Sequence, residues 1–100
     1  MKQKYSFTSE MWLYPGTTGN WHFVSLPKKY GAAIKQHFGT NARGWGSLRV
    51  EVRIGKTIWK TSIFPDNRQG TYILPIKADV RKREGLTRGE QVQLALTILV

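Results

Sequence analysis

Side chains that could carry out catalysis are few and lie far apart along this chain. The two histidines are His22 and His37, and the sequence has no cysteine and no H-E-x-x-H or comparable spacing that would hold a metal ion. The carboxylates are scattered, and they are Glu10, Glu51, Asp66, Asp79, Glu84 and Glu90. No pair of them suggests a general acid working with a general base. We therefore expect no catalytic residues, no metal and no cofactor, and a protein that is not an enzyme.

Positive charge is the strongest signal in the composition. Sixteen Lys and Arg residues against six Asp and Glu residues give a net charge of +10, which attracts polyanions over long distances. DNA or RNA is therefore a candidate partner, although a basic surface can also serve solubility alone. The candidate nucleic-acid contacts form a basic rim near the end of the chain and the exposed face of a central hairpin. They are Lys77, Arg81, Lys82, Arg83 and Arg88 in the rim, and Arg49, Arg53 and Lys60 in the hairpin.

Four tryptophans support a second hypothesis, a barrel that binds a small ligand or a protein. In this alternative, an aromatic pocket with few polar groups is lined by Trp12, Trp21, Trp45 and Trp59. Aromatic side chains among basic ones also suit a protein that binds single-stranded nucleic acid, so composition does not separate the two hypotheses. Trp45 lies in the segment GWGS, which is neither a G-x-S-x-G nucleophile motif nor a phosphate-binding loop. Trp45 on a loop could stack on a base or a sugar, but covering one end of the barrel is the favoured expectation.

Alternation of apolar and polar residues predicts the strands that would position these side chains. Strands are expected at residues 5–14, 21–26, 48–54, 57–64, 72–74 and 92–100, with a turn cluster at 15–20 and another at 65–70. The alternation fails near the end of the first strand, at Trp12 and Tyr14. Antiparallel pairing is expected between the first two strands, and a two-residue turn at Gly55 and Lys56 predicts a hairpin between the next two.

Two short helices are predicted, at residues 27–38 and 77–84. The first has Tyr30, Ala33, Ile34, His37 and Phe38 on one apolar stripe, where a histidine is more often a core or boundary residue than a catalytic one. Gly31 weakens this helix. Gly39 and Gly85 are expected to end the two helices in a left-handed conformation.

The order of these signals repeats along the chain. A strand, a Leu-Pro pair, a helix, a glycine, a loop and a strand occur between residues 20 and 54 and again between residues 71 and 100. Each unit has one apolar face that it cannot bury alone. We therefore predict a mainly β fold, a single small closed or partly closed β-barrel of about six strands with two short helices, built from two pseudo-repeated units and an N-terminal strand.

Four segments of the sequence resemble those of a known protein family. The whole chain resembles the bacterial domain-of-unknown-function 1905 (DUF1905) family through FTSEMWLY, WHFVSLP, VEVRIGKTIWKTSIFP and YILPIKADVRKREGLTRGEQVQLAL. The resemblance implies one barrel domain over residues 1–100, of the kind grouped with AbrB and MazE double-split barrels, and no established catalytic residues. Many relatives carry a further C-terminal YdeI/OmpD-associated region, which we expect this chain to lack.

The last segment also resembles the AbrB type of swapped hairpin. The residues that carry this likeness are Pro75, Arg81, Gly85, Leu86, Gly89, Glu90 and Val92. Proteins of that type often bind DNA as symmetric dimers, and here two units in one chain would form a pseudo-dimer. The matching positions are mostly turn and core residues, so they imply a fold more than a function.

No apolar run approaches the ~20 residues of a membrane span, and the first residues lack the apolar core of a signal peptide. With no cysteine to form a disulfide, we expect a cytoplasmic protein that does not enter a membrane. The oligomeric state does not follow from the sequence.

Overall fold

Six strands and two α-helices make up most of the chain in the computed structural model, which describes residues 3–15 and 21–99. In chain order they are β1 (Lys4–Leu13), β2 (His22–Ser25), α1 (Lys28–Phe38), β3 (Leu48–Ile54), β4 (Thr57–Asp66), β5 (Thr71–Pro75), α2 (Ala78–Glu84) and β6 (Gln91–Ile98). Two short 3-10 turns follow α1, η1 (Gly39–Asn41) and η2 (Gly44–Gly46). Parts of two predicted elements, residues 16–20 and Val100, lie outside the described residues.

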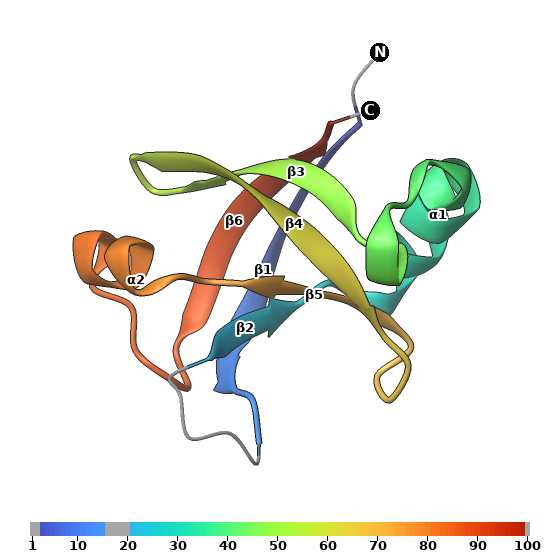
Figure 1. Cartoon of the computed structure of the whole chain (residues 1–100). Coiled ribbons are helices and arrows are strands. Elements are labelled where there is room, and N and C mark those ends of the chain that lie inside the picture. Colours follow the sequence, from blue (N-terminus) through green and yellow to red (C-terminus); the bar gives the residue numbers. More distant parts are fainter. Residues whose placement is uncertain (1–2, 16–20, 100) are drawn as a thin grey trace.

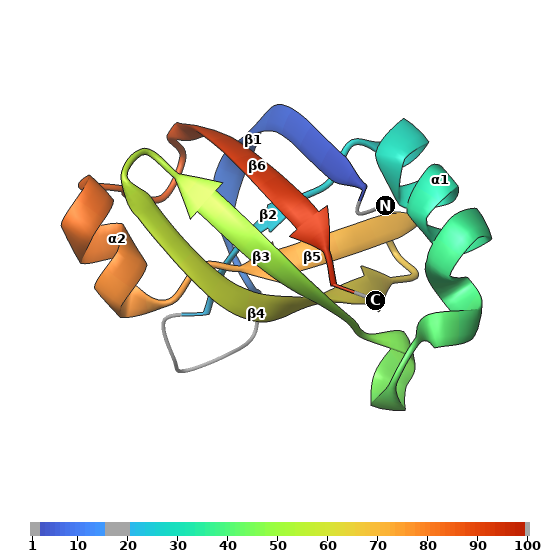
Figure 2. The same ribbon diagram turned by 90° about the horizontal axis from the view of Figure 1, so that it is seen from above.

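The strands close into an antiparallel barrel in the order β1-β2-β5-β4-β3-β6. The two helices lie at opposite ends of the barrel (Figures 1 and 2). Each strand pairs with two neighbours, and two strands divide their length between them. Residues 4–10 of β1 pair with β6 and residues 11–13 with β2, while residues 57–63 of β4 pair with β3 and residues 64–66 with β5. The mainly β fold, the closed six-stranded barrel and the two helices are as predicted, as are the antiparallel pairing of β1 with β2 and the β3–β4 hairpin.

The barrel has the connectivity of two equivalent halves. β2 pairs antiparallel with β5, and β3 pairs antiparallel with β6. Exchanging β1 with β4, β2 with β5 and β3 with β6 reproduces the same set of neighbouring strands. The sequence suggested that the first strand is an addition to the two repeated units. It is instead part of the repeat, because β4 is the counterpart of β1 in the second half.

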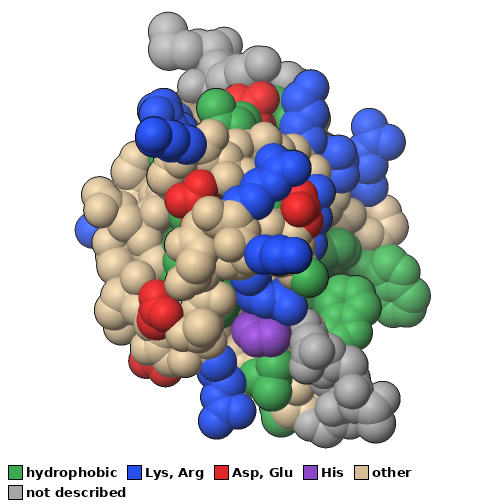
Figure 3. All heavy atoms as spheres, turned by 90° about the vertical axis from the view of Figure 1, so that its left-hand side faces the viewer, with side chains coloured by type: hydrophobic (Ala, Val, Ile, Leu, Met, Phe, Trp, Pro, Cys, Tyr) green, Lys and Arg blue, Asp and Glu red, His purple; other side chains and the backbone are tan. Residues whose placement is uncertain are grey.

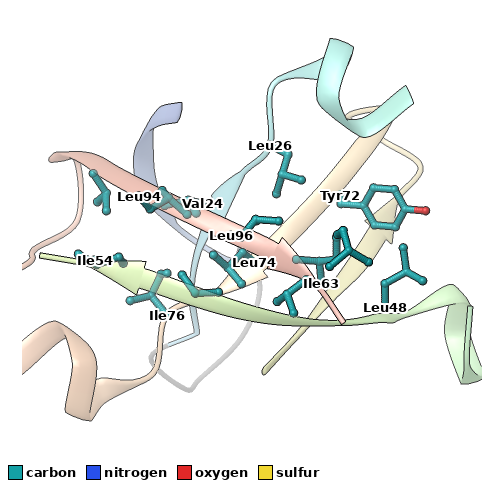
Figure 4. Packing of buried hydrophobic residues seen from close by; sticks show 14 of the residues in the cluster. Val24, Leu26, Leu48, Ile54, Ile63, Tyr72, Leu74, Ile76, Leu94 and Leu96 are labelled. Atoms are coloured by element: carbon teal, nitrogen blue, oxygen red, sulfur yellow. The ribbon is translucent and has the colours of Figure 1, made fainter. Parts of the chain in front are cut away.

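The core consists of inward-facing side chains from all six strands and from one face of each helix. In β3 and β6 the buried and exposed residues alternate, as expected for strands with one face toward the core. Figure 4 shows Val24, Leu74, Leu96 and Ile63 meeting inside the barrel. Tyr72 is buried at one end of this cluster, and burial raises the pKa of its phenol because the phenolate would be poorly solvated there.

Helix α1 approaches the barrel through Gly31. A Cβ atom at this position would lie 2.1 Å from Oγ1 of Thr71 and 3.2 Å from the Thr71 Cα, so only glycine fits between the helix and β5. The residue that looked like a weakness in the helix is thus a packing requirement. The buried stripe runs through Gly31, Ile34 and Phe38.

Two details of α1 differ from the prediction. His37 is exposed, because it precedes buried Phe38 and successive residues on a helix point about 100° apart. Gly39 does not end the helix in a left-handed conformation: its φ of −57° and ψ of −33° continue the right-handed turn into η1. The loop that the sequence predicts between the first helix and the third strand, at residues 40–46, therefore contains the end of η1 and all of η2.

Helix α2 is held in place by contacts of its buried face and by the turn at its C-terminal end. Val80 is buried, and the Thr57 hydroxyl donates a 2.6 Å hydrogen bond to Oε2 of Glu84, which joins the helix to the start of β4. Gly85 has a φ of 64°, the predicted left-handed stop. The N–H groups of Gly85 and Leu86 both donate to the carbonyl of Arg81, and Leu86 packs against the core as such a stop favours.

Candidate nucleic-acid interface

Four aromatic side chains gather on the outer face of β1 and β2, and we call them the aromatic strip: Trp12, Tyr14, Trp21 and Phe23. The rings of Trp12 and Phe23 are stacked, with centroids 5.3 Å apart. Trp21 lies nearly parallel to Phe23, with centroids 6.3 Å apart and 14° between the planes. Tyr14 contacts both Trp12 and Phe23. The strip is an apolar surface outside the barrel and is separate from its core.

Strand pairing builds the strip from two segments. Trp12 and Phe23 are directly opposite each other in the β1–β2 ladder, and the Tyr14 N–H donates to the carbonyl of Trp21 over 2.9 Å. The Trp12 indole N–H donates to Oγ of Ser25 over 2.9 Å. That hydroxyl in turn donates to Oε1 of Gln69 over 2.6 Å, which ties the indole to the β4–β5 turn. These bonds hold Trp12 in one orientation.

Cationic side chains flank the strip at one end. The Arg68 guanidinium carbon lies 5.5 Å from the centroid of the Tyr14 ring, within range of a cation–π contact. Arg88 lines a surface depression together with Trp12, Tyr14 and the acidic residue Glu10. Both arginines are exposed.

At the other end, Trp21 forms one wall of a pocket of about 320 Å³. Its remaining lining comes from the start of β2 and from the junction of β5 with α2, and consists of His22, Pro75, Ile76, Lys77, Ala78 and Arg81. The Ile76 N–H donates to the carbonyl of His22 over 2.8 Å, which holds the two sides together. Arg81 donates from Nη1 to the carbonyl of Ile76 over 2.7 Å. We call this cavity the Trp21 pocket.

Basic and apolar side chains occur together on this side of the molecule. Figure 3 shows the end of the barrel that carries α2, where Lys and Arg side chains surround a few acidic ones and border a hydrophobic patch beside the histidine. Among the acids, Asp79 forms an exposed ion pair with Arg83 over 3.3 Å. The surface thus offers aromatic rings and positive charge side by side.

The comparison with protein families covers this whole surface. The model of the family described as "Domain of unknown function (DUF1905)" matches residues 7–96, which include the aromatic strip, the cations beside it and the Trp21 pocket. The chain belongs to the DUF1905 family. No curated protein matches the sequence.

The basic residues singled out from the sequence of this DUF1905 domain occupy two surfaces. Lys77, Arg81, Lys82 and Arg83 lie at the start of α2 or within it, and Arg88 follows it beside the aromatic strip. Arg53 lies near α2 as well: its Nε donates to the carbonyl of Gly55, and a Cβ on Gly55 would contact Glu84. Their role in binding stays a prediction.

The other two hairpin candidates of the DUF1905 domain lie farther from α2. Arg49 is near the opposite end of β3, where its Nη1 donates to Oγ of Ser62 over 3.3 Å, and Lys60 faces Glu51 across the ladder. The Cα atoms of Arg49 and Arg53 are four residues apart on β3, which is about 13 Å along the strand.

The four tryptophans do not line one pocket, and this prediction was wrong. Trp59 packs against the hydrophobic core because it belongs to the inward-facing set of β4. Trp45 is 94% exposed on η2, so it does not cover the barrel end as expected, and its φ of 66° is the one left-handed value among the described residues other than glycine. Only Trp12 and Trp21 share a surface in this DUF1905 domain.

Sequence reasoning missed the remaining members of the site. Tyr14, Phe23 and Arg68 contribute to the aromatic strip or contact it, and His22 lines the Trp21 pocket. The failure of alternation at Trp12 and Tyr14 was the available signal, because apolar residues on successive positions place large apolar side chains on both faces of a strand. In residues 3–15 and 21–99 no three His, Asp or Glu residues are grouped to hold a metal ion, and no helix there is long and apolar enough to span a membrane.

Proposed function

We propose that this DUF1905 domain is a non-enzymatic binding barrel that binds nucleic acid across the aromatic strip. One observation carries the proposal: the strip is flanked by Arg68 and Arg88 at one end and by Lys77 and Arg81 at the other. Proteins that bind nucleic-acid strands combine aromatic rings, which stack on bases, with cations that follow the phosphates. The net charge of +10 would add long-range attraction for such a ligand.

A barrel with a single aromatic ligand pocket is the less favoured alternative. It required the four tryptophans to surround one cavity, and Trp45 and Trp59 lie elsewhere. The rings that remain form an open surface more than an enclosed cavity, and an open surface suits an extended ligand. The flanking cations favour a ligand that carries repeated negative charge.

Salt dependence of binding tests the proposal. Fluorescence anisotropy would measure the affinity of the protein for labelled single- and double-stranded DNA and RNA at several salt concentrations. We expect affinity to fall as salt rises, with a slope of log K against log salt of about −0.7 for each phosphate contacted in a single strand. Replacing both Lys77 and Arg88 with glutamine should then reduce the magnitude of the slope by about 1.4, because two contacts are lost.

A matched variant controls for total charge. Lys4→Gln with Lys28→Gln removes the same two charges from exposed positions at the start of β1 and the start of α1. It should leave the slope close to that of the unmodified protein. Absence of binding to every strand at low salt, or equal loss of slope in both double variants, would reject the proposal.

A further inference from the structure

The Trp21 pocket lies at one end of the aromatic strip, where Trp21 belongs to both. From its geometry we infer that it accepts one unpaired base of a single-stranded nucleic acid, an inference that rests on the proposed function. Its volume of about 320 Å³ lies at the lower end of the range of about 300–1,000 Å³ for small-molecule sites, which suits a single base better than a larger group.

Trp21 supplies the stacking surface. Trp21 as a residue is 58% exposed while its ring lies nearly parallel to Phe23, so we take one ring face to be available to a planar ligand. Pro75, Ile76 and Ala78 form an apolar surface in the same pocket. Every base has a flat π face, so this kind of site holds a base without reading its sequence.

Charged groups at the pocket match the phosphates of the nucleotide that the base belongs to. Lys77 is exposed beside the apolar surface, and Arg81 is half-buried in the lining. The hydrogen bond from Arg81 to the Ile76 carbonyl uses one of the five N–H groups that a guanidinium carries. Arg81 is therefore held in place before the ligand arrives, which reduces the entropy cost of binding.

The pocket requires an unpaired base. Inside a duplex both faces of a base are stacked and its edge is paired, so a duplex can fill the pocket only by flipping a base out at a cost of a few kcal/mol. The structure therefore favours a single strand over a duplex, although the duplex carries more phosphate charge per length. Along that strand, Trp12 and Tyr14 provide further rings that continue from Trp21 through Phe23.

The test compares a short oligodeoxythymidine strand with an abasic strand of the same length, which keeps the sugar and phosphate groups. We expect the intact strand to bind the unmodified protein more tightly by at least about 5- to 150-fold, the range that corresponds to stacking one base on one aromatic ring. Trp21→Leu should reduce this preference by about that factor while binding still falls with salt, because Trp12 and Tyr14 remain available to stack on other bases. The control Trp45→Leu makes the same change at a tryptophan that is 94% exposed outside the strip, and it should keep the preference.

The outcomes separate the two proposals. Equal affinity for the intact and abasic strands, both dependent on salt, would overturn the base pocket and leave nucleic-acid binding standing. A Trp21→Leu variant that prefers the intact strand as strongly as the unmodified protein does, or tighter binding of a duplex than of the single strand, would also overturn it. No binding of either strand at low salt would reject the interface as a whole. Circular dichroism of both leucine variants checks that each one folds.

Discussion

Phe23 illustrates how the aromatic strip is built at the scale of single residues. It lies on the outer face of β2, yet only 7% of its surface is exposed, because Trp12, Tyr14 and Trp21 surround it. Its burial stabilises the outer cluster in the same way that core residues stabilise the barrel. The three rings around it remain half-buried or exposed and are the ones that a ligand can reach.

Gly31 gives a prediction at the same scale. Gly31→Ala should lower stability by a net amount of about 1–2 kcal/mol, because overpacking against Thr71 outweighs the gain of about 1 kcal/mol in helix propensity. The nearest contact, 2.1 Å from the new Cβ to Oγ1 of Thr71, forces the helix away from β5. Denaturant unfolding, read as a change in midpoint, measures this loss.

A neighbouring residue supplies the control for Gly31. Ala32→Gly changes helix propensity at an exposed position of α1 and should cost about 1 kcal/mol through propensity alone. A Gly31→Ala variant that is more stable than the unmodified protein would show that α1 does not approach β5 as closely as described.

Single residues are also where sequence reasoning was weakest. The periodicity of α1 located its buried face with an error of one residue. The buried face consists of Gly31, Ile34 and Phe38, and His37 was wrongly assigned to it. Periodicity carries no information on close approach between elements, so the packing role of Gly31 could not be recognised. The contact between Arg68 and Tyr14 was hidden for a similar reason, because it joins segments that are distant in the sequence.

At the scale of elements, the ends of the two helices differ although both carry glycine. Gly85 is left-handed at the end of α2, whereas Gly39 is right-handed and leads from α1 into η1. The left-handed turn at Gly85 brings Leu86 onto the core and directs the chain to Arg88 and the aromatic strip. Helix α2 therefore depends on its glycine in a way that α1 does not.

Replacing each of these two glycines with alanine, in separate variants, tests this difference. Gly85→Ala should lower stability by about 1–2 kcal/mol, the cost of a left-handed residue with a Cβ atom. Gly39→Ala should leave stability unchanged or raise it by about 0.4–1 kcal/mol, because alanine adopts the right-handed conformation freely and restricts the unfolded chain. No atom lies within 4 Å of a Cβ at Gly85, so its effect isolates the backbone. Equal unfolding midpoints for the two variants would contradict the assignment.

The elements themselves were mostly predictable, for a physical reason. In strands with one buried face, such as β3 and β6, successive side chains point alternately to the core and to solvent. Apolar and polar residues therefore alternate in the sequence with a period of two. β4 was expected to stop before Pro65 but continues to Asp66, because Pro65 lies opposite Tyr72 within the ladder to β5. Turn-forming residues alone did not reveal that pairing.

At the scale of the whole molecule, the two equivalent halves place a pocket in corresponding positions. The Trp21 pocket lies between α2 and the start of β2, and a second pocket lies between α1 and the start of β5, where Gly70 and Thr71 are found. The repeat in the sequence predicted a barrel of two halves, since two units with complementary apolar faces close most simply on each other. It did not predict which half carries the exposed aromatic strip, because side chains on the outer face are not constrained by the core.

The location of binding on the folded protein is the most direct test of the account. Backbone amide chemical shifts would be followed by NMR while a short oligodeoxythymidine strand is added at low salt. We predict that the largest changes occur at residues 12–14, 21–23, 76–81 and 88, around the aromatic strip and the Trp21 pocket. Changes confined to α1 and the second pocket, or no localised changes while the strand binds, would contradict the account.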